Sequence, residues 1–381
     1  MPRPSKSVTP PAAARKSGWS LHFGSIAGIE LRVHATFFML LAWIATRHIL
    51  QGQSWAATLA TLASISAVFV LVVLHELSHA LMARRFGIRT QDITLLPIGG
   101  VARLERIPEK PREEFLVAIA GPAFNAALAA VLFGVLAFLG RPLSPSSVDG
   151  LSGGSFLLRM AWINVSLAVF NLIPAFPMDG GRVLRALLAM RLARAQATAI
   201  AAVVGQMLAF AVGLFGLFFN PMLVIIAVFV WMGAKQEAGA EQTRSALAGR
   251  RVQEAMMTDF TVLSPETPLS VAVEKTLRGA QHDFPVVDDG GRPIGTLTRE
   301  ILVKHLAESG MQTEVGRVMA KDVVIASPDD PLEDALPRLE SSESHTLFVT
   351  SAGRLVGIVD AENVVELMLF TTALKRQAQS V

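Results

Sequence analysis

Long runs of apolar residues constrain the fold of this chain more than any other feature of its sequence. Six runs occur, and the first five are near or above the ~20 residues that an α-helix needs to cross a bilayer. They lie at about residues 31–50, 55–83, 115–139, 156–176, 195–218 and 221–232. Charged residues make up only 17% of the chain, below the ~25% usual in soluble domains. We therefore expect a polytopic α-helical membrane protein with about six transmembrane helices and a soluble appendage.

The positions of Lys and Arg predict the orientation of these helices. If the six spans cross the membrane in alternating directions, the basic clusters around the first four spans all fall on one side of the membrane. The clusters contain Arg3, Lys6, Arg15, Lys16, Arg84, Arg85, Arg103, Arg106, Lys110, Arg112, Arg182, Arg185, Arg191 and Arg194. We expect that side to be the cytoplasm, so the protein should be a multi-pass protein of the cell membrane with both termini cytoplasmic. The net charge of +3 is too small to indicate nucleic acid as a partner.

Two segments of the membrane part are not expected to be helical. Residues 1–24 are rich in Pro, Ser, Ala, Arg and Lys, so we expect a disordered basic tail before a membrane domain over 25–240. Residues 87–104 contain β-branched residues and a Pro-Ile-Gly-Gly turn, which favours short strands. Non-helical backbone at membrane depth has to be buried in protein or line a wet cavity. A short re-entrant β segment and a plain cytoplasmic hairpin both stay open.

A sequence repeat defines the soluble appendage. After about residue 241 acidic residues become common and the apolar runs end. Residues 252–269 match residues 315–332 at an offset of 63 residues, including a shared Ser-Pro-x-x-Pro-Leu pattern. Each copy alternates short strands with helices, which is typical of an α/β module. We expect two units, at 250–309 and 313–372, that pair their faces to bury a shared core.

The motif His75-Glu76-Leu77-Ser78-His79 lies inside the second apolar run. Two His four residues apart share one face of a helix, in position to bind one zinc ion. Glu76 lies beside them, where it can accept a proton from a water that the metal activates. It is the only acidic residue within the first four apolar runs, and a carboxylate in lipid is costly enough to indicate function. The alternative is a pair of histidines packed in a core.

Asp179 is the candidate for the third protein ligand that a catalytic zinc site needs. It follows two prolines that break the end of the fourth apolar run, and a Gly pair follows it. Its alternative role is the N-cap of a helix over 180–194, but the need of His75 and Glu76 for a partner favours the ligand role. Asn171 offers an amide that can hydrogen-bond a developing oxyanion, or else caps a helix end. Asn125, in the third run, is expected to make a polar contact between helices. Because the chain has no Cys, thiolate ligands are excluded.

Together these residues resemble the site-2 protease family of intramembrane metalloproteases over roughly residues 20–235. The resemblance is carried by His75-Glu76-x-x-His79, Gly99-Gly100, Gly121-Pro122-x-x-Asn125 and Asn171-x-x-Pro174-x-x-Pro177-Met178-Asp179-Gly180, with Met178 where Leu is common. The resemblance implies one catalytic zinc ion bound by His75, His79 and Asp179. It also implies that Glu76 is the general base and that the substrate is a transmembrane helix, cut near the cytoplasm after local unwinding. The strands around Gly99-Gly100 would offer an edge to which the unwound segment adds.

The repeat resembles a pair of CBS domains. Such pairs often bind adenine nucleotides, so the resemblance implies that ATP or AMP regulates the attached protein. Families with this fold usually carry an Asp six residues after the positions of Gly295 and Gly357, but this chain has Ile301 and Asn363 there. A dimerisation or docking module, with the protein as a homodimer, is the alternative to nucleotide sensing, and both stay open.

The lead hypothesis for the whole chain is regulated intramembrane proteolysis by a zinc metalloendopeptidase. A CBS-regulated transporter or channel is a second hypothesis, although the two halves of the membrane part show no convincing repeat of the kind expected in transporters. A non-proteolytic relative that only binds membrane helices is a third hypothesis. All the candidate zinc and base residues are present, which disfavours it.

Overall fold

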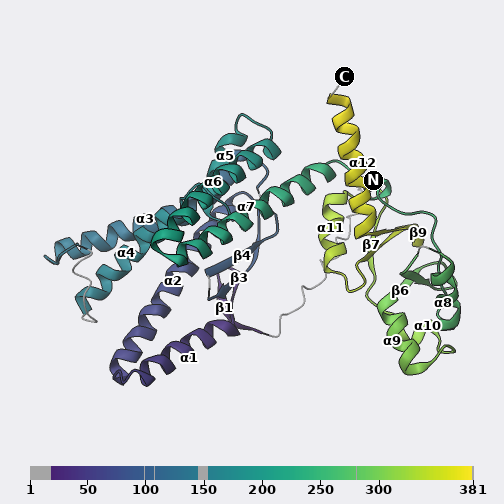
Figure 1. The fold of residues 1–381 in the computed structure, drawn as a ribbon, viewed down its shortest axis with the longest axis horizontal. Helices are drawn as coiled ribbons and strands as arrows, with labels where there is room; N and C mark the ends of the chain where they lie inside the picture. Colours follow the sequence, from purple (N-terminus) through teal and green to yellow (C-terminus); the bar gives the residue numbers. More distant parts are fainter. Residues whose placement is uncertain (1–18, 98, 107, 145–152, 280, 380–381) are drawn as a thin grey trace, which may run out of the picture. The chain divides into compact units, whose positions relative to one another are not determined.

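The computed structural model of the protein describes residues 19–97, 99–106, 108–144, 153–279 and 281–379. The chain divides into two compact units, Met1–Ala240 and Glu241–Val381. The first unit is dominated by helices, and the second consists of short strands and helices (Figure 1).

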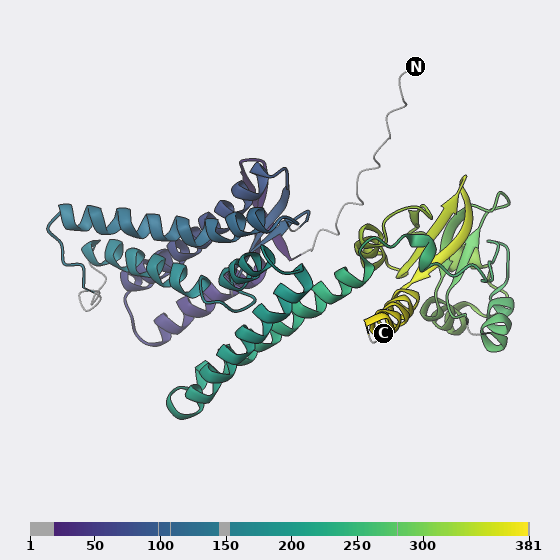
Figure 2. The same ribbon diagram turned by 90° about the horizontal axis from the view of Figure 1, so that it is seen from above.

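The first unit contains a four-stranded sheet and seven described helices. The strands are β1 (Ser20–Ile26), β2 (Ile29–His34), β3 (Thr90–Leu96) and β4 (Gly99–Leu104). The helices are α1 (Ala35–Leu50), α2 (Trp55–Arg85), α3 (Pro111–Phe138), α4 (Gly153–Asn171), α5 (Asp179–Ala189), α6 (Arg194–Phe219) and α7 (Pro221–Leu247). The last part of α7 belongs to the second unit. Figure 2 shows α6 and α7 running side by side as an antiparallel pair.

Four helices of the described residues are long and apolar enough to cross a membrane: α2, α3, α6 and α7. Helix α1 and the apolar part of α4, Phe156–Asn171, are shorter. The six predicted spans therefore match six apolar helices, of which four have full length, and the number of spans stays a prediction. Large side chains such as Phe210, Phe218 and Phe229 are more than half exposed, which is typical of a surface that contacts lipid.

The sheet is larger than the sequence predicts. Strands β3 and β4 form an antiparallel hairpin within residues 87–104. In addition, β2 pairs in parallel with β3, and β1 pairs antiparallel with β2. The order β1-β2-β3-β4 leaves β4 at one edge of the sheet.

The predicted disordered tail over residues 1–24 is wrong at its C-terminal end, because β1 begins at Ser20. The preceding residues 1–18 lie outside the described part. Trp19, Leu21 and Phe23 alternate with Ser20, His22 and Gly24. This is a strand signal that the composition of the tail, rich in Pro, Ser, Ala and basic residues, obscured.

The second unit repeats one arrangement of helices and strands. Its elements are η2 (Val252–Glu254), α8 (Leu269–Arg278), β5 (Phe284–Val287), β6 (Pro293–Leu297), α9 (Arg299–Ser309), α10 (Val315–Val318), β7 (Val324–Ala326), α11 (Leu332–Ser341), β8 (Thr346–Ser351), β9 (Arg354–Asp360) and α12 (Ala361–Gln379). Strands β5 and β6 form one sheet, and β7, β8 and β9 form another. Helices α8 and α11 are equivalent elements of the two sequence copies, because their first residues, Leu269 and Leu332, are 63 residues apart.

The two copies bury two cores rather than the single shared core that the repeat predicts. One core surrounds Leu269 and Phe284, and the other surrounds Leu332 and Leu347. Each copy nevertheless contributes to the core of the other: Val252 packs with Leu332, and Val315 packs with Leu269. Because each core takes residues from both copies, neither copy can complete its core alone.

Candidate metal centre

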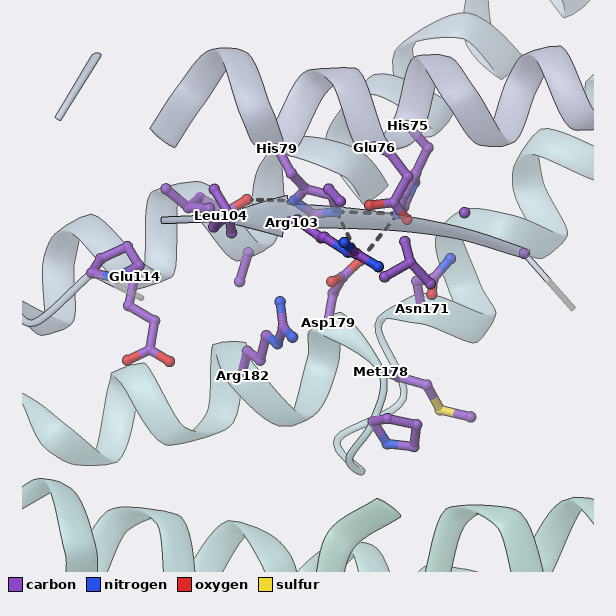
Figure 3. Close-up of a pocket in the computed structure, with 18 of the residues that line it drawn as sticks. His75, Glu76, His79, Arg103, Leu104, Glu114, Asn171, Met178, Asp179 and Arg182 are labelled. Atoms are coloured by element: carbon purple, nitrogen blue, oxygen red, sulfur yellow. Dashed lines mark hydrogen bonds and ion pairs between the residues drawn. The ribbon is translucent and has the colours of Figure 1, made fainter. Parts of the chain in front are cut away.

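The side chains of His75, His79 and Asp179 converge on one another in the first unit (Figure 3). The two histidines project from α2 one turn apart, and Asp179 is the first residue of α5. Nε2 of each histidine lies 3.1 Å from Oδ2 of Asp179, and the two Nε2 atoms lie 3.1 Å from each other. Within the described ranges this is the one group of three His, Asp or Glu whose ligand atoms converge in this way. The structure therefore brings together the three residues that the sequence proposes as ligands.

The hydrogen bonding of His79 leaves the appropriate nitrogen available for a metal. Nδ1 of His79 lies 2.6 Å from the carbonyl oxygen of Val117, which can only accept a hydrogen bond. With Nδ1–H donating to that carbonyl, Nε2 carries a lone pair directed at Asp179. Two imidazole nitrogens and a carboxylate oxygen at this spacing form a donor set that suits zinc. The residues present therefore fit a zinc ion.

A glycine on α3 allows close packing against both histidines. A Cβ atom at Gly121 would lie 2.3 Å from Nε2 of His79 and 2.7 Å from Nε2 of His75. Both distances are far below van der Waals contact, so any side chain at this position would occupy the space of the two candidate ligands. The Gly121 motif is thus part of the site, because it lets α3 form one wall of it.

A second glycine allows α5 to begin directly against the turn that ends α4. A Cβ atom at Gly180 would lie 2.2 Å from the carbonyl oxygen of Ile173.

The N-cap of α5 is Met178, and Asp179 is already the first helical residue. The alternative role of Asp179 as the N-cap of this helix is therefore wrong.

Glu76 faces the same cavity from α2 (Figure 3). Strand β4 passes close to it, since a Cβ atom at Gly100 would lie 2.7 Å from Cγ of Glu76. The cavity has a volume of about 750 Å³, within the range of sites that bind organic ligands. An edge strand and the proposed base thus share one cavity with the three candidate ligands.

The two asparagines differ in what surrounds them. Asn171 lines the cavity at the end of α4. Its Nδ2 donates to the carbonyl oxygen of Leu167 at 2.9 Å, which uses one of its two amide hydrogens. Asn125 is fully buried in α3, and its side chain has no hydrogen-bond partner among the described residues. The polar contact between helices that the sequence predicts for Asn125 is therefore not made there.

A buried ion-pair network beside the cavity is a part of the site that sequence reasoning missed. Arg185 of α5 is only 1% exposed, and its guanidinium lies 2.6 Å from Glu114 of α3 and 2.5 Å from Glu237 of α7. Arg194 of α6 contacts the other oxygen of Glu114 at 3.0 Å. Burial by itself would lower the pKa of Arg185, but the two carboxylates outweigh it and raise that pKa, so the side chain stays charged. The network ties the helix that begins with Asp179 to three neighbours.

Both parts of the chain match known protein families. The sequence profile of peptidase family M50 matches residues 63–152 and 146–214, and that of the CBS domain matches residues 252–308 and 315–369. The zinc metalloprotease MJ0392 of Methanocaldococcus jannaschii is 31% identical over 354 residues, which cover 92% of this chain and 96% of the relative. Stage IV sporulation protein FB of Bacillus subtilis is 26% identical over 291 residues, covering 73% and 92%. The solved structure of the site-2 protease from Methanocaldococcus jannaschii shares 36% identity, with a TM-score of 0.42, and covers 58% of this chain and 95% of that one.

The apolar helices and these matches define a membrane-embedded zinc metalloprotease that carries a CBS pair. The chain belongs to peptidase family M50, and its enzyme class is that of the site-2 type metalloendopeptidases. The resemblance drawn from the sequence motifs is confirmed. Membership of a protease family also decides against the transporter hypothesis.

Proposed function

We propose that His75, His79 and Asp179 bind one catalytic zinc ion. The observation that carries this proposal is the convergence of their three donor atoms, 3.1 Å apart, although Asp179 lies 104 residues after His75 and 100 residues after His79. The fit of Gly121 against both imidazoles supports it, because a side chain at this position of α3 would occupy the space of the two imidazoles. When bound, zinc would polarise the scissile carbonyl and acidify the attacking water.

Glu76 acts as the general base in this proposal. It accepts a proton from the attacking water and passes it to the nitrogen of the leaving amine, so that the peptide bond breaks and no net proton is consumed. The free amide hydrogen of Asn171 stabilises the negative charge that develops on the carbonyl oxygen. The shared cavity supports both roles.

The proposed substrate is a transmembrane helix of another membrane protein, cut toward the cytoplasmic side of the bilayer. Backbone groups in a helix are already paired, so the substrate unwinds locally before attack. The unwound segment adds as a strand to the free edge of β4, next to Glu76. In this proposal the protein spans the cytoplasmic membrane and both of its termini lie in the cytoplasm. The basic residues that end α2 support this orientation, because basic residues are more frequent on the cytoplasmic side.

Two variants test the site. Glu76→Gln should fold and retain one zinc ion per chain, yet release no fragments from membrane-protein substrates, which quantitative proteomics of the membrane fraction would detect. Retained cleavage by this variant would contradict the role of Glu76. Asp179→Ala should lose most of its zinc in elemental analysis, and unchanged zinc stoichiometry would remove Asp179 from the ligand set.

The CBS pair is proposed to regulate the protease through an adenine nucleotide, with homodimerisation through the same pair as the alternative. The two positions that usually carry Asp have other roles: Ile301 packs against a core, and Asn363 exchanges hydrogen bonds with Asp360 at the start of α12. Titration of the full-length protein with ATP and AMP by calorimetry tests the nucleotide. If neither nucleotide gives a heat of binding and the protein sediments as a dimer in analytical ultracentrifugation, the homodimerisation role is favoured.

A further inference from the structure

Two arginine side chains face the catalytic cavity and take no part in the chemistry described above. Arg103 comes from β4 and Arg182 from α5, and both line the cavity that contains Glu76 and the zinc ligands. Figure 3 shows the two side chains turned toward the cavity from its opposite walls. Two cations on separate elements that meet at one cavity require an explanation, because like charges repel.

The charges of these two arginines are poorly neutralised by the protein. Arg103 approaches Asp92 only to 3.9 Å, which is beyond hydrogen-bond distance. Arg182 has no carboxylate within 4 Å among the residues that the structure describes. The nearby Glu114 is engaged by Arg185 and Arg194.

The bound metal would not remove this excess of positive charge. The two positive charges of zinc are balanced by Asp179 and Glu76, which are the acidic residues of the proposed site. The loaded cavity therefore keeps the positive charge of Arg182 and that of Arg103, which the long contact with Asp92 offsets only in part.

Both arginines lie on the same side of the zinc ligands. Along β4, Arg103 follows Gly100 by three residues, ~10 Å in an extended strand, toward the end where Leu104 pairs with Thr90. Thr90 follows closely on the end of α2 at Arg85. Arg103 therefore lies toward the side that we propose to be cytoplasmic.

Arg182 lies in the same direction from its own ligand. It is one turn after Asp179 on α5, ~5 Å along the axis. The next turn of α5 carries Arg185, which contacts Glu114 in the first turn of α3. Helix α5 thus runs toward the basic segment that precedes α3, on the proposed cytoplasmic side.

We propose that Arg103 and Arg182 select substrates that carry an acidic side chain on the cytoplasmic side of the cleaved bond. This inference rests on the proposed function and deepens it. Most transmembrane helices carry Lys or Arg at their cytoplasmic end, and the two arginines at the cavity repel such a segment. An Asp or Glu there forms a charge-assisted pair with one or both guanidinium groups. The pair of arginines thus combines attraction for one class of membrane helix with repulsion of the common class.

The test measures binding separately from hydrolysis. Three labelled single-span peptides share one apolar segment with a central Gly-Pro break and differ in four residues at its cytoplasmic end, which are all Asp, all Asn or all Lys. Their dissociation constants are measured with the full-length Glu76→Gln protein in lipid nanodiscs. We expect the Asp peptide to bind about tenfold more tightly than the Lys peptide, with the Asn peptide between them.

Charge reversal in the protein then tests the two arginines. Adding Arg103→Glu and Arg182→Glu to the Glu76→Gln protein should reverse the order, so that the Lys peptide binds best. If the reversed variant folds poorly, Arg103→Gln with Arg182→Gln should abolish the preference instead. The matched control is Arg106→Glu with Arg191→Glu, which changes the same number of charges at exposed positions outside the cavity and should keep the preference for Asp.

Equal binding of the three peptides, or the same reversal in the control variant, overturns the inference. If the order of peptide affinities reverses in the Arg103→Glu, Arg182→Glu variant but not in the control, a role limited to orienting Glu76 is also excluded. Such a role would not depend on the charge of the peptide. Hydrolysis is read separately with the wild-type protein. Absence of cleavage there contradicts the proposed function, whereas equal binding contradicts only the selection by charge.

Discussion

At the scale of single residues, the proposed metal centre depends on a position that carries no side chain. Gly121 belongs to α3, whereas the histidines it touches belong to α2, and only the lack of a Cβ atom lets the two helices come this close. The sequence places this glycine in a recognisable motif, but it does not show that the glycine contacts His75 and His79. The contact requires the packing of two helices that the pattern of apolar residues leaves unspecified.

Gly121→Ala should therefore abolish zinc binding while leaving the protein folded. The new methyl group would lie 2.3 Å from Nε2 of His79, so the imidazole has to turn away from Asp179. Zinc per chain in elemental analysis should fall well below one, and cleavage should fall with it.

Gly134→Ala is the matched control for this substitution. Gly134 lies on the same helix, and a methyl group there would meet no atom within 4 Å, while Ala favours helix over Gly by roughly 1 kcal/mol. We expect full zinc content and unchanged or slightly higher thermal stability. Normal zinc content in Gly121→Ala would contradict the close packing of α3 against the site.

At the scale of elements, the short helix α5 has to be held in place for Asp179 to reach the histidines. Arg185 does so through Glu114 and Glu237, which belong to the longer helices α3 and α7. Because the guanidinium is almost completely buried, its removal would leave the Glu114 carboxylate buried with only one partner, Arg194.

Arg185→Met should destabilise the first unit by about 3–5 kcal/mol, the usual effect of removing one partner of a buried pair. Thermal unfolding in detergent, followed by Trp fluorescence, measures the change. Lys110→Met is the control, because Lys110 pairs with Glu113 at 3.0 Å but is 78% exposed. Such a pair contributes at most about 1 kcal/mol. Similar losses in the two variants would contradict a structural role for the buried network.

Local spacing made part of the site predictable. His75 and His79 share a helix face whatever the rest of the chain does, and Asp179 followed from the break in the fourth apolar run. The network around Arg185 could not be predicted, because an Arg after a membrane span is normally explained by orientation alone. Strand β2 was missed for a related reason, since its pairing with β3 joins segments about 60 residues apart. Local pattern does not specify such long-range pairing.

At the scale of the whole molecule, the protease unit is joined to a repeat whose two copies are not equivalent. Gly295 and Gly357 occupy matching places in the two copies. A Cβ atom at Gly295 would lie 2.5 Å from the carbonyl oxygen of Ala320, whereas one at Gly357 would lie 2.7 Å from Sδ of Met256. A backbone carbonyl cannot move aside as easily as the end of a Met side chain.

Gly295→Ala should therefore destabilise the CBS pair by about 1–3 kcal/mol, the usual range for overpacking, and Gly357→Ala should cost less. Hydrogen–deuterium exchange of the full-length protein measures this, as faster exchange in residues 252–369. Equal effects of the two substitutions would show that the copies respond alike. The zinc content should stay unchanged in both variants.

The free edge of β4 has a consequence for the supply of water. Lipid tails offer no hydrogen bonds, so unpaired backbone groups of this strand have to be hydrated when no substrate is bound. If β4 lies at membrane depth, as its place beside Glu76 predicts, its unpaired backbone groups require water next to Glu76. Hydrolysis consumes one water molecule for each peptide bond. The same edge that is proposed to receive the peptide thus also brings the second reactant to the place where it is used.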